Sequence, residues 1–177
     1  MRFHFAPLRW RDARQIRRWR YTEPYSVYDL NTPDMLVALY LSPLWRLAGV
    51  ARFCAVRDEH GTLVGMFQFM RHGAAMEIGV ALRPDLTGQG LGLDLVRAGL
   101  LYGVRHFQPV IFKLEVAAFN ERARRVYERA GFRAVRSLPK RVGSRTLAVL
   151  EMVCPAVDVP LTAVGAPVAA HENADPR

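Results

Sequence analysis

A glycine-rich stretch between a short apolar run and a long amphipathic one constrains the fold more than any other feature of this sequence. The segment 82–92 carries Gly88, Gly90 and Gly92 at alternate positions, and a helical pattern follows over 90–107. Glycine adopts positive φ angles readily and lets the backbone come close to a ligand. Amides at a helix N-terminus bind anions, so the stretch predicts a pyrophosphate-binding loop between a strand and a helix. A tight strand–helix turn without a ligand is the alternative interpretation.

Two other phosphate-binding patterns do not fit this loop. The dinucleotide pattern GxGxxG requires glycine where the sequence has Leu93, and the phosphate loop GxxxxGK[ST] requires a lysine that is absent there. The histidines and the two cysteines, Cys54 and Cys154, have no metal-binding spacing, so no metal is expected. Cys54 lies in an apolar run and is interpreted as a core residue.

The periodicity of the rest of the chain predicts a mixed α/β sheet in one domain. Strands are expected at 3–8, 53–56, 63–70, 75–82, 111–117, 133–137 and 146–153, and helices at 12–20, 32–41, 90–107 and 120–130. That order corresponds to about seven strands flanked by about four helices, with parallel pairing at the centre of the sheet. A single domain is expected over 1–154, and residues 155–177, which show no periodicity, are expected to form a flexible tail.

The charge of the chain favours anionic partners over cationic ones. The sequence has 25 basic and 16 acidic residues, for a formal net charge of +9, and every basic residue except Lys113 and Lys140 is arginine. This charge attracts anions at long range and repels polycations. Two cysteines far apart indicate a reducing compartment, and no apolar run is long enough to span a membrane. A cytoplasmic protein without membrane contact is therefore expected.

The glycine-rich loop resembles the acetyl-CoA loop of the GNAT superfamily of N-acetyltransferases, whose usual pattern is Q/R-x-x-G-x-G/A. Gly90 and Gly92 match the two small positions, whereas Thr87 stands at the leading Gln/Arg position. This departure removes a side-chain contact but leaves the backbone amides of the loop in place.

A second motif resembles the fifth strand and the following helix of the same superfamily. The segment 114–120 reads LEVAAFN, and Ala123, Tyr127 and Gly131 follow at the spacing of the family. The resemblance covers about residues 50–153. Within the superfamily, the sequence is similar to bacterial ribosomal-protein N-terminal acetyltransferases and other small members. It implies the GNAT fold, in which a mixed sheet splays between its fourth and fifth strands.

The resemblance implies acetyl-CoA as the co-substrate and places its binding residues around the splay. The backbone of 80–82 would pair with the pantetheine arm like a missing strand, and a β-bulge at Gly79 would produce the splay. Asn120 is expected to contact the cofactor and also to cap a helix. The expected cofactor-binding residues are Val80, Ala81, Leu82, Thr87, Gly88, Gln89, Gly90, Leu91, Gly92 and Asn120.

Acetyl transfer from a thioester to an amine needs a base for the amine proton and a donor for the departing thiolate. Glu115 and Glu77 are the candidate bases, because two branches of the family have a carboxylate at similar places. Glu115 is preferred for its spacing to Asn120 and Tyr127. Tyr127 is the candidate acid. A solvated, ion-paired carboxylate is the alternative interpretation for each glutamate, and core packing is the alternative for the tyrosine.

These residues predict an acetyl-CoA-dependent N-acetyltransferase that transfers the acetyl group directly to a primary amine. A protein N-terminus or a lysine is the expected acceptor, and a small amine such as a polyamine or an aminoglycoside is the alternative. Thr87 motivates a further alternative, a catalytically silent module that only binds acyl-CoA. Monomer and homodimer are both open.

The N-terminal region is rich in arginine and aromatic residues. The arginines are Arg9, Arg11, Arg14, Arg17, Arg18 and Arg20. A solvated helix face is the preferred interpretation, and a weak contact with RNA or the ribosome is the alternative. The aromatic residues expected to line an acceptor groove between the first two helices are Trp10, Trp19, Tyr21, Tyr25 and Tyr28.

Overall fold

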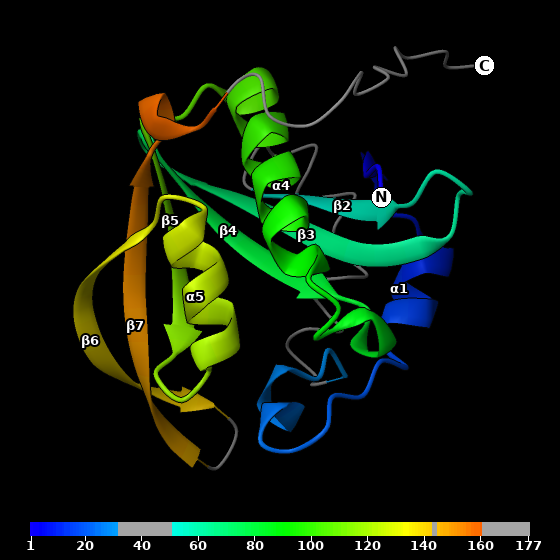
Figure 1. Cartoon of the computed structure of the whole chain (residues 1–177), viewed down its shortest axis with the longest axis horizontal. Coiled ribbons are helices and arrows are strands. Elements are labelled where there is room, and N and C mark those ends of the chain that lie inside the picture. Colours follow the sequence, from blue (N-terminus) through cyan, green and yellow to red (C-terminus); the bar gives the residue numbers. More distant parts are fainter. Residues whose placement is uncertain (32–50, 143–144, 161–177) are drawn as a thin grey trace.

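The computed structural model describes residues 1–31, 51–142 and 145–160. Its strands form one seven-stranded mixed sheet in the order β1-β2-β3-β4-β5-β7-β6 (Figure 1). The strands are β1 (His4–Pro7), β2 (Ala51–Arg57), β3 (Leu63–His72), β4 (Ala75–Leu82), β5 (Ile111–Ala117), β6 (Arg133–Val142) and β7 (Arg145–Pro155). The described residues also form the helices α1 (Trp10–Ile16), α4 (Leu91–Phe107) and α5 (Glu121–Arg129), and the 3-10 helices η1 (Tyr25–Tyr28), η2 (Pro84–Leu86) and η3 (Ala156–Asp158).

Helices cover both faces of this sheet, so the protein has two apolar layers. α4 and α5 pack against one face, where Phe67 and Phe112 are fully buried, and Figure 1 shows both helices in front of the sheet. α1 packs against the other face through residues such as Ile16. Cys54 is fully buried in the first layer, and burial raises the pKa of its thiol to about 12, so its predicted core role is confirmed. The predicted α/β class is confirmed as well, whereas the expected helix at 32–41 lies outside the described residues.

β4 and β5 separate soon after they begin to pair. Their parallel pairing runs only from Ala75 with Ile111 to Glu77 with Lys113, although both strands continue beyond these residues. The predicted splay between the fourth and fifth strands is therefore confirmed, and Figure 1 shows the two strands diverging from a shared upper end. The later halves of both strands are left with edges that face a gap.

No β-bulge in β4 accompanies the splay, so the expectation at Gly79 is wrong. β3 and β4 pair residue for residue from Gly65 with Leu82 to His72 with Ala75. A Cβ at Gly79 would lie 3.2 Å from Oε1 of Gln68. The glycine therefore makes room for a side chain of the neighbouring strand and does not shift the register.

The first helix begins earlier and ends sooner than the predicted helix at 12–20. α1 begins after Arg9, which is its N-cap residue, and Asp12 lies in the first turn, where its side chain accepts from the N-cap amide. The buried carboxylate of Asp12 accepts a hydrogen bond from the Arg9 amide at 3.0 Å and pairs with Arg57 of β2 at 2.5 Å. This ion pair draws Asp12 into the interior, and a capping argument based on neighbouring residues alone does not include it.

The packed part of the chain extends past residue 154. β7 continues to Pro155, η3 follows, and Val159 is buried in the layer that contains α4. Residues 161–177, most of the expected tail, lie outside the described residues. Within the part of the chain that the structure describes, no helix is long and apolar enough to cross a membrane, and His, Cys, Asp and Glu side chains form no cluster suited to a metal ion. The cytoplasmic location stays a prediction.

Candidate functional site

The glycine-rich loop forms an open cradle at the N-terminus of α4. Gly88 and Gly90 both have φ of +81°, a conformation that residues with side chains rarely adopt. No atom lies within 4 Å of the position that a Cβ would take at either glycine. Gly90 is the N-cap of a helix of 17 residues, whose first amides have no partner within the helix. A loop with this strained, glycine-only backbone in front of unpaired helix amides suits the pyrophosphate of a CoA molecule.

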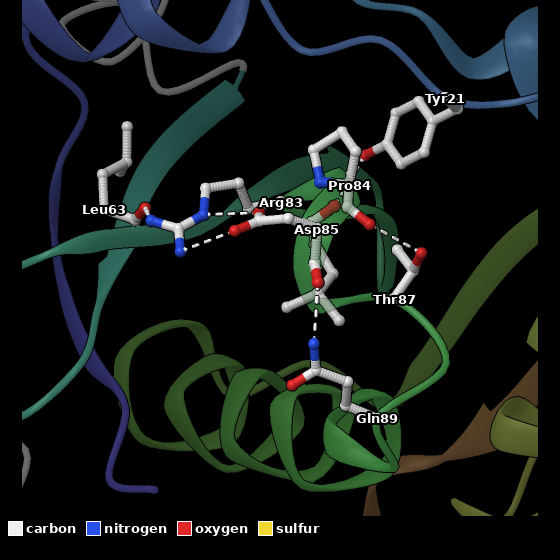
Figure 2. A network of polar contacts seen from close by, with 8 residues as sticks. Tyr21, Leu63, Arg83, Pro84, Asp85, Thr87 and Gln89 are labelled. Atoms are coloured by element: carbon white, nitrogen blue, oxygen red, sulfur yellow. Dashed lines mark hydrogen bonds and ion pairs between the residues drawn. The ribbon is translucent and has the colours of Figure 1, made fainter.

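Side chains within the loop stabilise it from inside (Figure 2). Arg83 donates two hydrogen bonds to Asp85, at 2.7 and 3.0 Å, and a third to the Leu63 carbonyl oxygen at 3.2 Å. The Thr87 hydroxyl donates to the carbonyl oxygen three residues earlier, and the Gln89 amide donates to the Asp85 carbonyl oxygen, each at 2.7 Å. The side chains of Thr87 and Gln89 therefore hold the loop conformation, and the Thr87 amide is also bonded within the loop, so the amides of 88–92 are the ones left to meet a ligand.

β4 presents the backbone groups of Val80 and Leu82 to the splay. Arg83 donates its amide to the Val64 carbonyl oxygen on β3 at 2.8 Å. Because successive residues of a strand direct their backbone groups to opposite sides, Leu82 and Val80 direct theirs away from β3. Ala81 directs its backbone groups toward β3 for the same reason. Two of the three residues predicted on β4 therefore have backbone groups at the open edge.

Two tyrosine hydroxyls bind the open edges of the splay. Tyr21 donates to the Leu82 carbonyl oxygen on β4 at 2.8 Å, and Tyr28 accepts from the Ala117 amide on β5 at 3.1 Å. Tyr28 ends η1, which lies below the mouth of the splay in Figure 1. The sequence predicts these tyrosines only as walls of a groove, because neither their spacing nor their neighbours indicate contacts with strand backbone.

Tyr127 on α5 interacts electrostatically with Tyr21 and Tyr28, whose hydroxyls bind the two strand edges. Burial raises the pKa of the Tyr127 hydroxyl, and the nearby Tyr28 and Tyr21 raise it further. The Tyr127 ring packs edge-on against Phe132, with 5.9 Å between the ring centroids. A phenol whose pKa is raised keeps its proton at neutral pH and can donate it.

Asn120 begins the same helix. Its side chain accepts a hydrogen bond from the Ala123 amide at 3.1 Å, so its predicted role as a cap is confirmed. This cap fixes the start of α5 just after the end of β5, and it thereby helps to position Tyr127 on that helix.

The two candidate bases lie at different points of the splay. Glu77 stands at the last paired position, and its Oε2 is 3.2 Å from both His72 Nε2 and Lys113 Nζ. Glu115 lies on β5 past this last pair and forms an ion pair with Lys140 of β6. The structure therefore does not bring the two glutamates to one point, and only Glu115 lies in the open part.

The N-terminal aromatic residues have different environments. Trp19 is buried in the α1 layer, and the expected groove between the first two helices stays a prediction, because the expected helix at 32–41 lies outside the described residues. Trp10 is 57% exposed and carries Arg11 and Arg14, each 5.5 Å from its ring centroid. Tyr25 begins η1, the 3-10 helix that ends at Tyr28. The contact of this region with RNA stays a prediction.

Comparison with known families identifies the class of protein that this fold and site define. The family described as "Acetyltransferase (GNAT) domain" matches residues 2–133, which is well over half of the 177-residue chain. The chain therefore belongs to the GNAT acetyltransferase family, and the resemblance carried by the two sequence motifs is confirmed.

A curated relative is also an acetyltransferase. The chain is similar to the mycothiol acetyltransferase of Propionibacterium freudenreichii subsp. shermanii, with 38% identity over 93 residues. That match covers 48% of this chain and 28% of that enzyme, so the chain spans less than a third of the length of the curated relative.

Solved structures with the same fold include two of an acetyltransferase from Vibrio cholerae. The spermidine N-acetyltransferase in complex with CoA and spermine has a TM-score of 0.73 and 21% identity, covering 88% of this chain and 96% of that chain. The spermidine/spermine N-acetyltransferase in complex with manganese ions has a TM-score of 0.68 and 22% identity, covering 87% and 92%. At these identities the likeness shows the shared fold alone, and the predicted GNAT fold is confirmed.

Proposed function

We propose that the chain transfers the acetyl group of acetyl-CoA directly to a primary amine. The observation that carries this proposal is the splay between β4 and β5, which has the glycine-rich loop after β4 and two tyrosines on its edges that lie near the proton-bearing Tyr127. Bound acetyl-CoA would supply a thioester whose carbonyl carbon an amine can attack. The amides of 88–92 would hold its pyrophosphate, and the open edge at Val80 and Leu82 would hold its arm.

Tyr127 would give its proton to the departing sulfur. Burial raises the pKa of its hydroxyl, so the protonated form persists at neutral pH. Proton transfer by a positioned side chain contributes about 10²–10⁴-fold to a rate. The hydroxyls of Tyr21 and Tyr28, bound to the two strand edges, would hold the surroundings of Tyr127 in place.

Glu115 would accept the amine proton. Its side chain is 31% exposed in the open part of the splay, so an amine that arrives from solvent can reach it. Its ion pair with Lys140 is exposed, and exposed ion pairs contribute little free energy and exchange easily. Glu77 is less suited, because it stands at the junction of the two strands between His72 and Lys113.

We propose a protein N-terminus or a protein lysine as the acceptor, and a small amine as the second candidate. An α-amine, with a pKa of about 7.7–8.0, loses its proton more easily than a lysine at about 10.4. The names of the relatives, enzymes of mycothiol and spermidine, support the second candidate. The net charge of +9 opposes polycations and favours amines of low charge.

Release of CoA thiol in the presence of three amine probes tests the proposal. The probes are a peptide with a free N-terminus, a lysine peptide with a blocked N-terminus, and spermidine. We expect release to require an amine and Glu115→Gln to lower kcat/KM by about tenfold or more. Glu77→Gln is the matched control, for which we expect a much smaller effect.

Binding and turnover separate the remaining alternatives. A rise in the thermal midpoint with acetyl-CoA but no thiol release with any probe would favour the silent acyl-CoA-binding module. If acetyl-CoA causes no rise in the thermal midpoint and no probe causes thiol release, the proposed function is overturned. An effect of Glu77→Gln larger than that of Glu115→Gln would overturn the assignment of the base.

A further inference from the structure

The two lysines of this arginine-rich chain both contact the candidate base carboxylates. Lys113 Nζ lies 3.2 Å from Glu77 Oε2, and the Lys140 amine donates a hydrogen bond to Glu115. In every other ion pair among the residues that the structure describes, the basic partner is arginine or histidine. Arginine stays charged at any physiological pH, whereas a lysine amine can lose its proton and react. The lysine amines of the chain therefore lie on the residues expected to deprotonate an acceptor.

Lys140 contacts the carboxylate that an acceptor amine would have to reach. β7 separates β6 from β5 in the sheet, so the contact of Lys140 with Glu115 brings part of the β6–β7 hairpin over β5. Glu115 lies past the last β4–β5 pair, in the open part of the splay. The Lys140 side chain is 53% exposed, which leaves its four-carbon stem free to change rotamer.

We propose that Lys140 is an internal acceptor that the chain acetylates when no outside amine occupies the site. This inference rests on the acetyltransferase activity proposed above. The Lys140 ammonium loses one proton to Glu115, and Nζ forms a bond to the acetyl carbonyl carbon while the bond from that carbon to sulfur breaks. CoA leaves as a thiol with a proton from Tyr127, and the second Nζ proton, lost as the amide forms, restores the tyrosine. Lys140 becomes an uncharged N-acetyl-lysine and releases Glu115 from its ion pair.

Lys113 provides a comparison within the same chain. It stands at the junction where β4 and β5 still pair, with its side chain 29% exposed. Its partner Glu77 also contacts His72, so this carboxylate has two basic side chains as partners. We expect Lys113 to remain unmodified, because it lies at the closed end of the splay.

The test follows both lysines in the full chain incubated with acetyl-CoA that carries a deuterated acetyl group. Peptide mass spectrometry measures the deuterated acetyl group on each lysine. We expect Lys140 to be labelled about tenfold or more faster than Lys113, at a rate that dilution of the protein leaves unchanged. Glu115→Gln and Tyr127→Phe should slow the labelling by about tenfold or more. Lys113→Arg is the matched control and should leave the labelling of Lys140 as it is.

Thiol release with an added free-N-terminus peptide, measured in the same samples, keeps the two proposals apart. Labelling of Lys140 no faster than that of Lys113, in a chain that acetylates the peptide, would overturn the internal acceptor and leave the proposed function standing. Labelling that survives both Glu115→Gln and Tyr127→Phe would show spontaneous acetylation and would overturn it as well. If the chain neither acetylates the peptide nor labels Lys140, the proposed function and the internal acceptor are both overturned. Slower labelling of Lys140 as the peptide concentration rises would support a shared site.

Discussion

The hydroxyl of Tyr21 donates a 2.8 Å hydrogen bond to the carbonyl oxygen of Leu82, at a point where β4 has already separated from β5. On the other side of the gap, the hydroxyl of Tyr28 accepts from the Ala117 amide at 3.1 Å. Backbone groups inside a protein need partners, and a sheet edge has lost the ones that a neighbouring strand supplies. Two side chains from a distant part of the sequence take the place of those strand contacts.

Tyr21→Phe should separate the stability of the chain from its response to acetyl-CoA. Loss of the hydrogen bond to Leu82 should lower the free energy of unfolding by about 0.5–1.5 kcal/mol. The arm of acetyl-CoA, bound along β4, would satisfy the same carbonyl oxygen. We therefore expect a lower thermal midpoint for the variant alone and a larger rise of the midpoint on addition of acetyl-CoA.

Tyr25→Phe is the control for this experiment, because it removes a hydroxyl from the same segment and keeps the ring that packs against Phe119 and Arg122. An equal loss of midpoint for Tyr21→Phe with and without acetyl-CoA would mean that the arm does not reach Leu82.

Tyr127→Phe should lower kcat by about 100-fold, because it removes the proton donor for the departing thiolate. Burial raises the pKa of Tyr127, so the donor form is fully populated below the ordinary tyrosine pKa of about 10 and persists above it. We therefore expect no fall in kcat from this group between pH 7 and about 10, while deprotonation of the amine raises the rate over the same range. An unchanged kcat in Tyr127→Phe would contradict the role of Tyr127 as proton donor, and a fall in kcat near pH 8–9 that is present in the native chain and absent from Tyr127→Phe would contradict its raised pKa.

Gly99→Ala should destabilise the chain strongly, although alanine favours helices over glycine by about 1 kcal/mol. A Cβ at Gly99 on α4 would lie 2.1 Å from the ring of Phe67, which is fully buried and has no room to move. We expect a loss of about 1–3 kcal/mol, measured by denaturant unfolding.

Gly92→Ala in the same helix is the matched control, because its Cβ would meet Val126 at 3.4 Å, an ordinary contact. We expect it to be neutral or slightly stabilising in the absence of ligand. Equal losses for Gly99→Ala and Gly92→Ala would show that helix position decides the cost and that the Phe67 contact does not.

Asp12→Ala should cost about 1–3 kcal/mol of unfolding free energy, because a buried carboxylate joins α1 to β2. It binds the Arg9 amide and Arg57 at the same time. Glu121→Ala is the matched control, since Glu121 pairs with Arg125 on an exposed helix face, where such a pair contributes about 0.3–0.5 kcal/mol. Thermal unfolding of both variants measures the difference, and similar small losses would show that Asp12 contributes no more than a surface ion pair.

Much of the fold is predictable from local patterns. The strand over Ala75–Leu82 and the strand over Ile111–Ala117 have the predicted bounds, because alternating apolar residues and flanking turns mark them clearly. The bounds of α1 are not predictable in this way, since the partner that places Asp12 is Arg57, far along the chain. Pairing between distant residues carries no periodic signal.

The candidate site follows the same division. The glycine cradle and the cap at Asn120 depend on neighbouring residues, so the sequence predicts their local geometry. The hydroxyl contacts of Tyr21 and Tyr28 and the placement of Lys140 on Glu115 depend on how the strands separate and how a hairpin bends. These arrangements exist only in the assembled sheet, so no spacing of residue types predicts them.

The short paired segment of β4 and β5 is the one place where two halves of the sheet are joined by strand pairing among the described residues. Pairing from Ala75 to Glu77 joins a block made of β1 to β4 to a second block made of β5, β7 and β6. Met76 and Phe112 face each other across this seam and are fully buried. Small rotations of the two blocks about this junction would widen or narrow the gap between the far ends of β4 and β5. We therefore expect the packing of Met76 against Phe112, which lie at the closed end, to influence how tightly the proposed site binds a thioester.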